Sequence, residues 1–166
     1  MWIPADAITL RTFNEVAAGG LLQWRGEWVM KSSYADTDRG GRVTPLGVIL
    51  TGPRRGQWEP EINLPEVPLI SLAPDWKWRP EIEGADSISI GEPTVGSLLY
   101  TSQGLAVSCI HQIYPCYAGL DGLDHYPVVG HQRAVPRAAR WAGALVSPNG
   151  TSTWQIFKVD STQQPS

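Results

Sequence analysis

The sequence predicts an all-β protein, either an antiparallel barrel or a sandwich, with one short helix near its N-terminus. Three observations favour this fold class. Glycine and proline approach a fifth of the 166 residues, with 17 glycines and 14 prolines, so turns are many and long helices few. After the first twenty residues, the apolar pattern changes from a helical period toward the period of two that is typical of strands. Short turn sequences such as Arg25-Gly26 separate the apolar runs, which favours antiparallel hairpins.

The predicted helix runs from about Leu10 to Ala18. Its apolar residues recur at helical spacing, and they are Leu10, Phe13, Val16 and Ala17. Thr9 can cap the start of this helix, and Gly19-Gly20 can end it with a left-handed residue. A helix this short needs a partner surface, so we expect it to pack at one end of the sheets.

Strands are expected through the remainder of the chain. Two of them flank Arg25-Gly26, and further hairpins turn at Gln103-Gly104 and at Pro148-Asn149-Gly150. The other expected strands are the segments LGVILTG, PLISLA, DWKW and SISIG. The segment from Pro136 to Leu145 has an alternative, a short helix with proline in its first turn.

A similar unit occurs three times, starting at Gly47, Gly96 and Gly143. Each copy is a glycine, an apolar strand, a turn with another glycine and a return strand, at intervals of roughly 48 residues. The specific alternative fold is therefore a three-repeat, β-trefoil-like barrel, although any hairpin has this residue pattern. We predict a single domain over residues 1–160 and a flexible C-terminal tail over residues 161–166.

A closer internal match relates QWEPEI, residues 57–62, to KWRPEI, residues 77–82. Proline cannot donate to a sheet ladder, so Pro60 and Pro80 are expected to end edge strands. Trp58 and Trp78 would then be the last paired residues of these two strands.

Composition and charge bear on the partners that the protein could have. The net charge is −3 and the longest basic run is Arg54-Arg55, so nucleic acid is not an expected partner. No apolar window reaches the length of about 18 residues that a membrane span requires, so no membrane association is expected. The first ten residues lack the pattern of a secretory signal, and we expect a cytoplasmic protein. An unpaired strand edge near either proline would allow a homodimer.

Both cysteines and all three histidines fall within residues 109–131. On a strand, Cys109 and His111 would point to one face, and Cys116, His125 and His131 could complete a zinc site from the following loop. Their spacing is C-x-H-x4-C-x8-H-x5-H, which lacks the close cysteine pairs of structural zinc motifs. Zinc is accordingly the only cofactor that this cluster suggests.

The same segment allows other interpretations, and one is a Cys109–Cys116 disulfide, which would form in an oxidising compartment and whose short loop would contribute modestly to stability. Cys116, expected in a loop between two tyrosines, could be a catalytic nucleophile with His125 as its base. The simplest alternative is that the cysteines are buried core residues and the histidines serve a glycine-rich loop. Loops held by a sheet often carry function, so we expect the loop that follows His111 to lie near whatever site the protein has.

Eight tryptophans are an unusual number beside two phenylalanines. They can fill the core, or they can form a binding face, because exposed indoles stack on sugar rings and anchor protein partners. The residues predicted to bind a ligand are Trp58, Trp76, Trp78, Tyr117 and Tyr126. Phosphate loops, dinucleotide fingerprints and nucleophile elbows are missing from the sequence. The favoured function is thus a non-catalytic domain that binds a protein or a carbohydrate-like ligand on a rim rich in tryptophan and loops. The alternative is a small zinc or cysteine hydrolase centred on residues 109–131.

Overall fold

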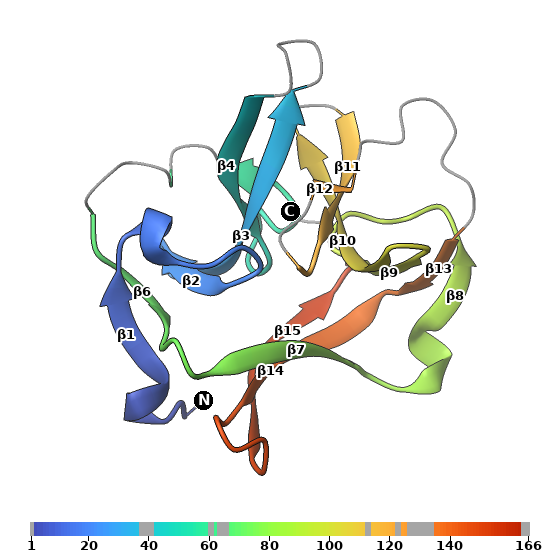
Figure 1. Cartoon of the computed structure of the whole chain (residues 1–166). Helices are drawn as coiled ribbons and strands as arrows, with labels where there is room; N and C mark the ends of the chain where they lie inside the picture. The colour runs from blue at the N-terminus through green and yellow to red at the C-terminus, as the bar shows by residue number, and fades with distance from the viewer. Residues whose placement is uncertain are drawn as a thin grey trace.

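The all-β prediction is confirmed by the computed structural model, in which three antiparallel sheets form a sandwich-like arrangement (Figure 1). The structure describes residues 2–36, 42–59, 62, 67–111, 114–121, 124–125 and 135–163, with the backbone alone for 34–36, 42, 111, 114, 124 and 125. The strands of these residues do not close into a barrel. The helical pieces within them are short 3-10 turns, at Ala5–Ala7, Phe13–Glu15 and Ala85–Ser87.

Sheet A has the strand order β1-β6-β2-β3-β4-β5. Its strands are β1 (Ile8–Arg11), β2 (Leu21–Trp24), β3 (Glu27–Asp36), β4 (Arg42–Ile49), β5 (Trp58–Glu59) and β6 (Leu69–Leu72). The predicted turn between β2 and β3 is confirmed, because Arg25 and Gly26 have φ values of 51° and 81°. Two consecutive positive φ values define the turn type that matches the right-handed twist of a hairpin.

Sheet B has the order β12-β11-β10-β9-β13-β8. Its strands are β8 (Ile88–Gly91), β9 (Leu98–Thr101), β10 (Gly104–His111), β11 (Tyr114–Gly119), β12 (Asp124–His125) and β13 (Val135–Ala138). The long loop expected after His111 is therefore wrong over residues 114–119, which pair with β10 throughout. Residues 122–123 and 126–131 of that predicted loop lie outside the described residues.

Sheet C has the order β15-β14-β7 and consists of β7 (Lys77–Ile82), β14 (Arg140–Val146) and β15 (Thr153–Asp160). The alternative of a helix over residues 136–145 is wrong, because β13 and β14 occupy this segment. Pro80 lies on an edge strand as expected, but it does not end that strand. It pairs with Gly143, and β7 continues to Ile82, so Trp78 is not the last paired residue. Proline is tolerated there because β7 has a neighbour on one side only. Pro60 lies outside the described residues.

The predicted N-terminal helix is wrong. Leu10 belongs to β1, and Phe13–Glu15 form a single 3-10 turn. A continued helix would use the carbonyl groups of residues 13, 14 and 16 for its own N–H groups. The Lys31 ammonium instead donates hydrogen bonds to these three oxygens, at 2.9, 3.2 and 2.7 Å. A tertiary interaction thus replaces the helix that the local apolar spacing predicts.

The three similar units found in the sequence are all hairpins, and each belongs to a different sheet. The first contains β4 and β5, the second β9 and β10, and the third β14 and β15. The repeated residue pattern is thus a repeated hairpin. The closed barrel that the trefoil-like alternative requires is not formed by the described strands.

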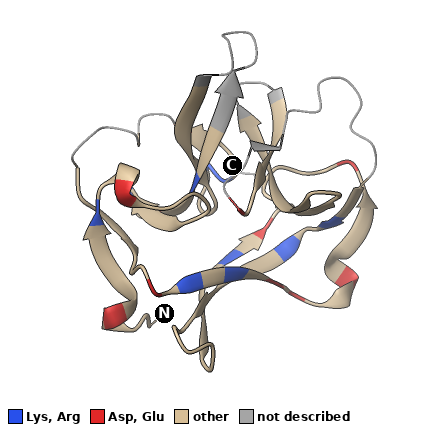
Figure 2. Cartoon of the chain, in the orientation of Figure 1, with Lys and Arg blue, Asp and Glu red and all other residues tan. Residues whose placement is uncertain are grey.

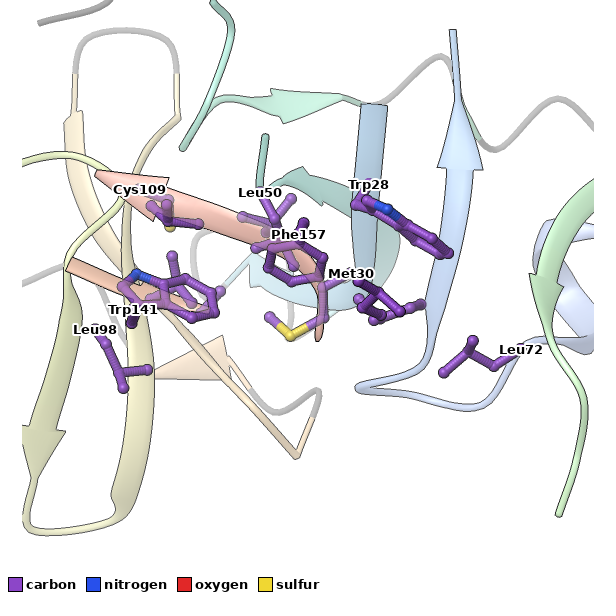
Figure 3. Close-up of a cluster of buried hydrophobic side chains, with 14 of the residues drawn as sticks. Trp28, Met30, Leu50, Leu72, Leu98, Cys109, Trp141 and Phe157 are labelled. Atoms are coloured by element: carbon purple, nitrogen blue, oxygen red, sulfur yellow. The ribbon is translucent and has the colours of Figure 1, made fainter. Parts of the chain in front are cut away.

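One hydrophobic core collects side chains from all three sheets (Figure 3). Phe157 of β15 lies at its centre, with ring centroids 6.2 Å from Trp28, 6.1 Å from Trp78 and 5.8 Å from Trp141. The Trp141 indole is fully buried and donates a hydrogen bond of 2.9 Å to the Gly96 carbonyl. Tryptophan therefore supplies most of the aromatic bulk of this core, beside its buried leucines.

Residues 161–163, which the sequence places in the C-terminal tail, contact the body of the protein. The buried Ser161 hydroxyl lies 3.0 Å from the Ala139 carbonyl and 3.1 Å from the hydroxyls of Thr94 and Ser97. The carbonyl of Gln163 accepts a hydrogen bond of 2.7 Å from Arg55. These bonds attach the end of β15 to sheets A and B.

Candidate pocket beside Trp76 and Trp78

Two of the predicted metal ligands, Cys109 and Cys116, lie directly opposite each other on β10 and β11. Of the remaining three, His111 ends β10 and His125 lies on β12, but neither side chain is described, and His131 lies outside the described residues. Among the side chains that the structure describes, no group of three or more potential ligands could hold a metal ion. The zinc site therefore stays a prediction that depends on the three histidines.

Cys116 does not lie in a loop, as the sequence suggested, but within β11, where its exposed fraction is 1%. Its sulfur lies 3.1 Å from the sulfur of Cys109, which is fully buried. A nucleophilic cysteine needs solvent access, and the fold denies it to this thiol. The structure therefore adds no support to a cysteine enzyme.

The predicted binding residues divide into two groups. Trp58 is buried in the core, and its indole N–H donates to the sulfur of Cys109 at 2.9 Å. Tyr117 is also buried, which raises the pKa of its phenol. Neither residue presents a flat face to solvent, and Tyr126 lies outside the described residues. Trp76 and Trp78 both line a pocket, where Trp78 is half-buried and Trp76 is as buried as Trp58.

This pocket has a volume of about 420 Å³ and lies where the end of β6, the start of β7 and the loop after the first 3-10 turns meet. Trp76 and Trp78 line it together with residues 16–20, which form its rim, and with Leu120. The Trp78 indole N–H donates to the Gly19 carbonyl at 2.8 Å, so this indole is tied to the rim. Trp76 packs against Trp154 with ring centroids 5.4 Å apart. Each of the two indoles is therefore fixed by a contact with another part of the protein.

Lys31 shapes the rim of the pocket. Its ammonium holds the carbonyls of residues 13, 14 and 16, lies over the Phe13 ring at 4.9 Å, and burial lowers its pKa. Its backbone also bonds to Gly19 and Gly20, at 2.9 Å in both cases. A Cβ at residue 20 would lie 2.7 Å from Val16 Cγ1 and 2.8 Å from the Ala17 oxygen, so the rim needs glycine there. The sequence predicted a helix end at this glycine pair and missed the pocket rim.

The charged groups of the pocket are both cationic. Arg11 and Lys77 line it, and none of its described lining residues is acidic. Lysine and arginine recur along the neighbouring β7 (Figure 2). Asp75 is exposed in the turn before Trp76 but does not line the pocket. Two cations beside two indoles form a surface suited to an anionic group attached to an apolar or ring-shaped body.

No protein-family model matches this chain, and no curated protein or solved structure matches it either. Within the described residues, no helix has the length and apolar character needed to cross a bilayer. The class that the fold and the site define is thus an all-β domain with a pocket lined by two tryptophans and two cationic side chains in its described part.

Proposed function

We propose that this protein is a non-catalytic binding domain whose ligand is a carbohydrate-like molecule with an acidic group. The observation that carries the proposal is the meeting of Trp76 and Trp78 with Arg11 and Lys77 in one pocket. Pockets that bind small molecules have volumes of about 300 to 1,000 Å³, and this one falls within that range.

Each part of the pocket has a role in the proposed complex. The C–H faces of a sugar ring pack on indole surfaces, which supply apolar area at a low cost in conformational entropy. A carboxylate on the ring would accept charge-assisted hydrogen bonds from Arg11 and Lys77. Because the Trp78 indole is already bonded to Gly19, little ordering would accompany binding.

Two features favour binding over catalysis and a small ligand over a protein partner. The described lining residues hold neither a carboxylate pair nor a histidine, which are the most usual general acids and bases. The indoles are buried or half-buried and contact the pocket from its wall, whereas protein-binding hot spots usually project an aromatic side chain outward.

The test is a calorimetric titration of the full chain with an oligogalacturonate and with a neutral oligosaccharide of the same length. We expect binding of the acidic oligomer only, with an affinity that falls as salt rises. Lys77→Gln and Arg11→Gln should each weaken it about tenfold or more, since a hydrogen bond to a charged group contributes about 1.5 to 3 kcal/mol.

Arg79→Gln is the matched control. Arg79 is exposed on the same strand and pairs with Glu81 at 3.1 Å, but it does not line the pocket. Equal binding of the neutral oligomer would refute the acidic group. An affinity that is unchanged in Lys77→Gln and Arg11→Gln would refute the pocket as the site.

A further inference from the structure

The two cysteines form a close pair that the proposed binding function does not use. Cys109 and Cys116 are opposite residues in the register of β10 and β11, and their sulfur atoms are 3.1 Å apart. Directly opposite residues in antiparallel strands have Cα atoms about 4.5 or 5.5 Å apart. Both separations lie within the range of about 4.4 to 6.8 Å that a disulfide spans. The backbone is therefore already placed for a bond between the two sulfurs.

The pair lies where sheet A meets sheet B. The Trp58 indole of β5 donates to the Cys109 sulfur at 2.9 Å, and the backbone N–H of Ile110 donates to the Gly56 carbonyl at 2.7 Å. Gln57 and Ile110 form a parallel bridge between the same two segments. A new bond at the cysteine pair would therefore change the surroundings of the Trp58 indole, which belongs to the neighbouring sheet.

We propose that Cys109 and Cys116 form a redox-responsive site, which a small disulfide such as oxidised glutathione converts into an intramolecular disulfide. In the first step, one cysteine thiolate attacks the small disulfide and releases one glutathione thiolate, leaving a mixed disulfide. In the second step, the other cysteine attacks the protein sulfur of that mixed disulfide and releases the second glutathione. The protein loses two protons and two electrons, and one oxidised glutathione becomes two reduced ones.

Burial sets the rate of this reaction, because both sulfurs are hidden from solvent in the closed protein. In the described part of sheet B, β11 is covered on its outer side only by the two-residue β12. Strands near a sheet edge open locally more easily than the whole protein unfolds. The first attack therefore requires local opening of β11, and the second is fast because the strand register returns the two sulfurs to contact.

The test treats the reduced full chain with oxidised glutathione at neutral pH. We expect a mass loss of about 2 Da with no retained glutathione, as two hydrogen atoms leave. Thiol titration in denaturant should fall from two groups to none, since the chain has two cysteines. Trypsin leaves both cysteines on the single peptide of residues 78–133, and this peptide should be about 2 Da lighter after oxidation. Tryptophan fluorescence should drop, because a disulfide quenches an indole in contact with it, and should recover on reduction.

Two variants separate this proposal from general oxidation. Cys116→Ser has one thiol and should retain glutathione as a stable adduct, with no 2 Da loss. Trp58→Phe keeps both cysteines and should still form the disulfide, but with a much smaller change in fluorescence. A persistent adduct or a linked dimer in the wild-type protein would overturn the proposal. So would two titratable thiols remaining after an exposure that fully oxidises free dithiothreitol.

Discussion

Gly143 of β14 lies directly opposite Phe157 of β15, and this contact gives the sharpest test of the core. A Cβ at residue 143 would overlap two atoms of the Phe157 ring and lie 2.8 Å from a third, Cε2. The ring cannot move aside easily, because Trp28, Trp78 and Trp141 surround it with centroids about 6 Å away. Gly143→Ala should therefore strain the core although it adds only one methyl group.

The expected loss of stability in Gly143→Ala is the difference between two opposing effects. Overpacking a close-packed core costs about 1 to 3 kcal/mol. Replacing glycine in a strand by alanine returns about 0.5 to 1 kcal/mol through the unfolded chain. Because three ring atoms lie too close to the added Cβ, the upper part of that cost applies, and the net loss in the free energy of unfolding should be about 1 to 2.5 kcal/mol. For a chain of this length it corresponds to a Tm lower by about 3 to 8 °C.

The assay is thermal and urea unfolding followed by circular dichroism. Gly91→Ala is the matched control, because a Cβ at this strand glycine meets only Arg137 atoms, at 3.8 and 3.9 Å. Without a clash, this variant should be more stable than the wild type by about 0.5 to 1 kcal/mol. Phe157→Leu should lower the cost of Gly143→Ala, giving a coupling of about 1 kcal/mol in a double-mutant cycle. Wild-type stability of Gly143→Ala, or strict additivity with Phe157→Leu, would refute this account of the core.

Two further predictions concern the N-terminal segment. Lys31→Met leaves three backbone oxygens without their ammonium donor. The free energy of unfolding should therefore fall by about 1 to 3 kcal/mol. The rate of amide hydrogen exchange over residues 14–20 should rise. Unchanged exchange there would show that Lys31 does not hold the pocket rim. Glu15 accepts hydrogen bonds from the Thr12 backbone N–H and hydroxyl, chiefly the former, which lowers its pKa below 4.5. Its stabilisation is present above pH 4.5 and is lost as pH falls through the folded pKa. The acid-induced drop in Tm should therefore be smaller in Glu15→Gln, and identical slopes for the two proteins would contradict this assignment.

The strands could be predicted where the residues of a short turn define the hairpin by themselves. Arg25-Gly26 and Gln103-Gly104 join strands that are neighbours in both sequence and space, so residue types alone locate these hairpins. The helix over residues 10–18 could not be rejected in this way. What prevents it is the Lys31 ammonium, which lies beyond the segment and is brought to it only by the pairing of β2 with β3.

The candidate site was predicted only in part. Trp76 and Trp78 are predicted binding residues and both line the pocket, whereas Trp58, which has the same sequence context as Trp78, does not line it and is buried in the core. The difference arises from the junction of sheets A and B, where Trp58 contacts Cys109. The rim at residues 16–20 and Leu120 are distant in sequence, so no local pattern places them beside the tryptophans.

The position of Phe157 has a consequence for how the chain acquires its structure. This residue completes a core shared by all three sheets, yet it belongs to the last strand of the described fold. During synthesis on the ribosome, the apolar faces of the earlier strands stay exposed until β15 has been made and can cover them. Folding dominated by such distant contacts is slow, and the exposed faces are open to association while it lasts. A truncation before Thr153 should therefore yield an aggregating chain instead of a smaller domain.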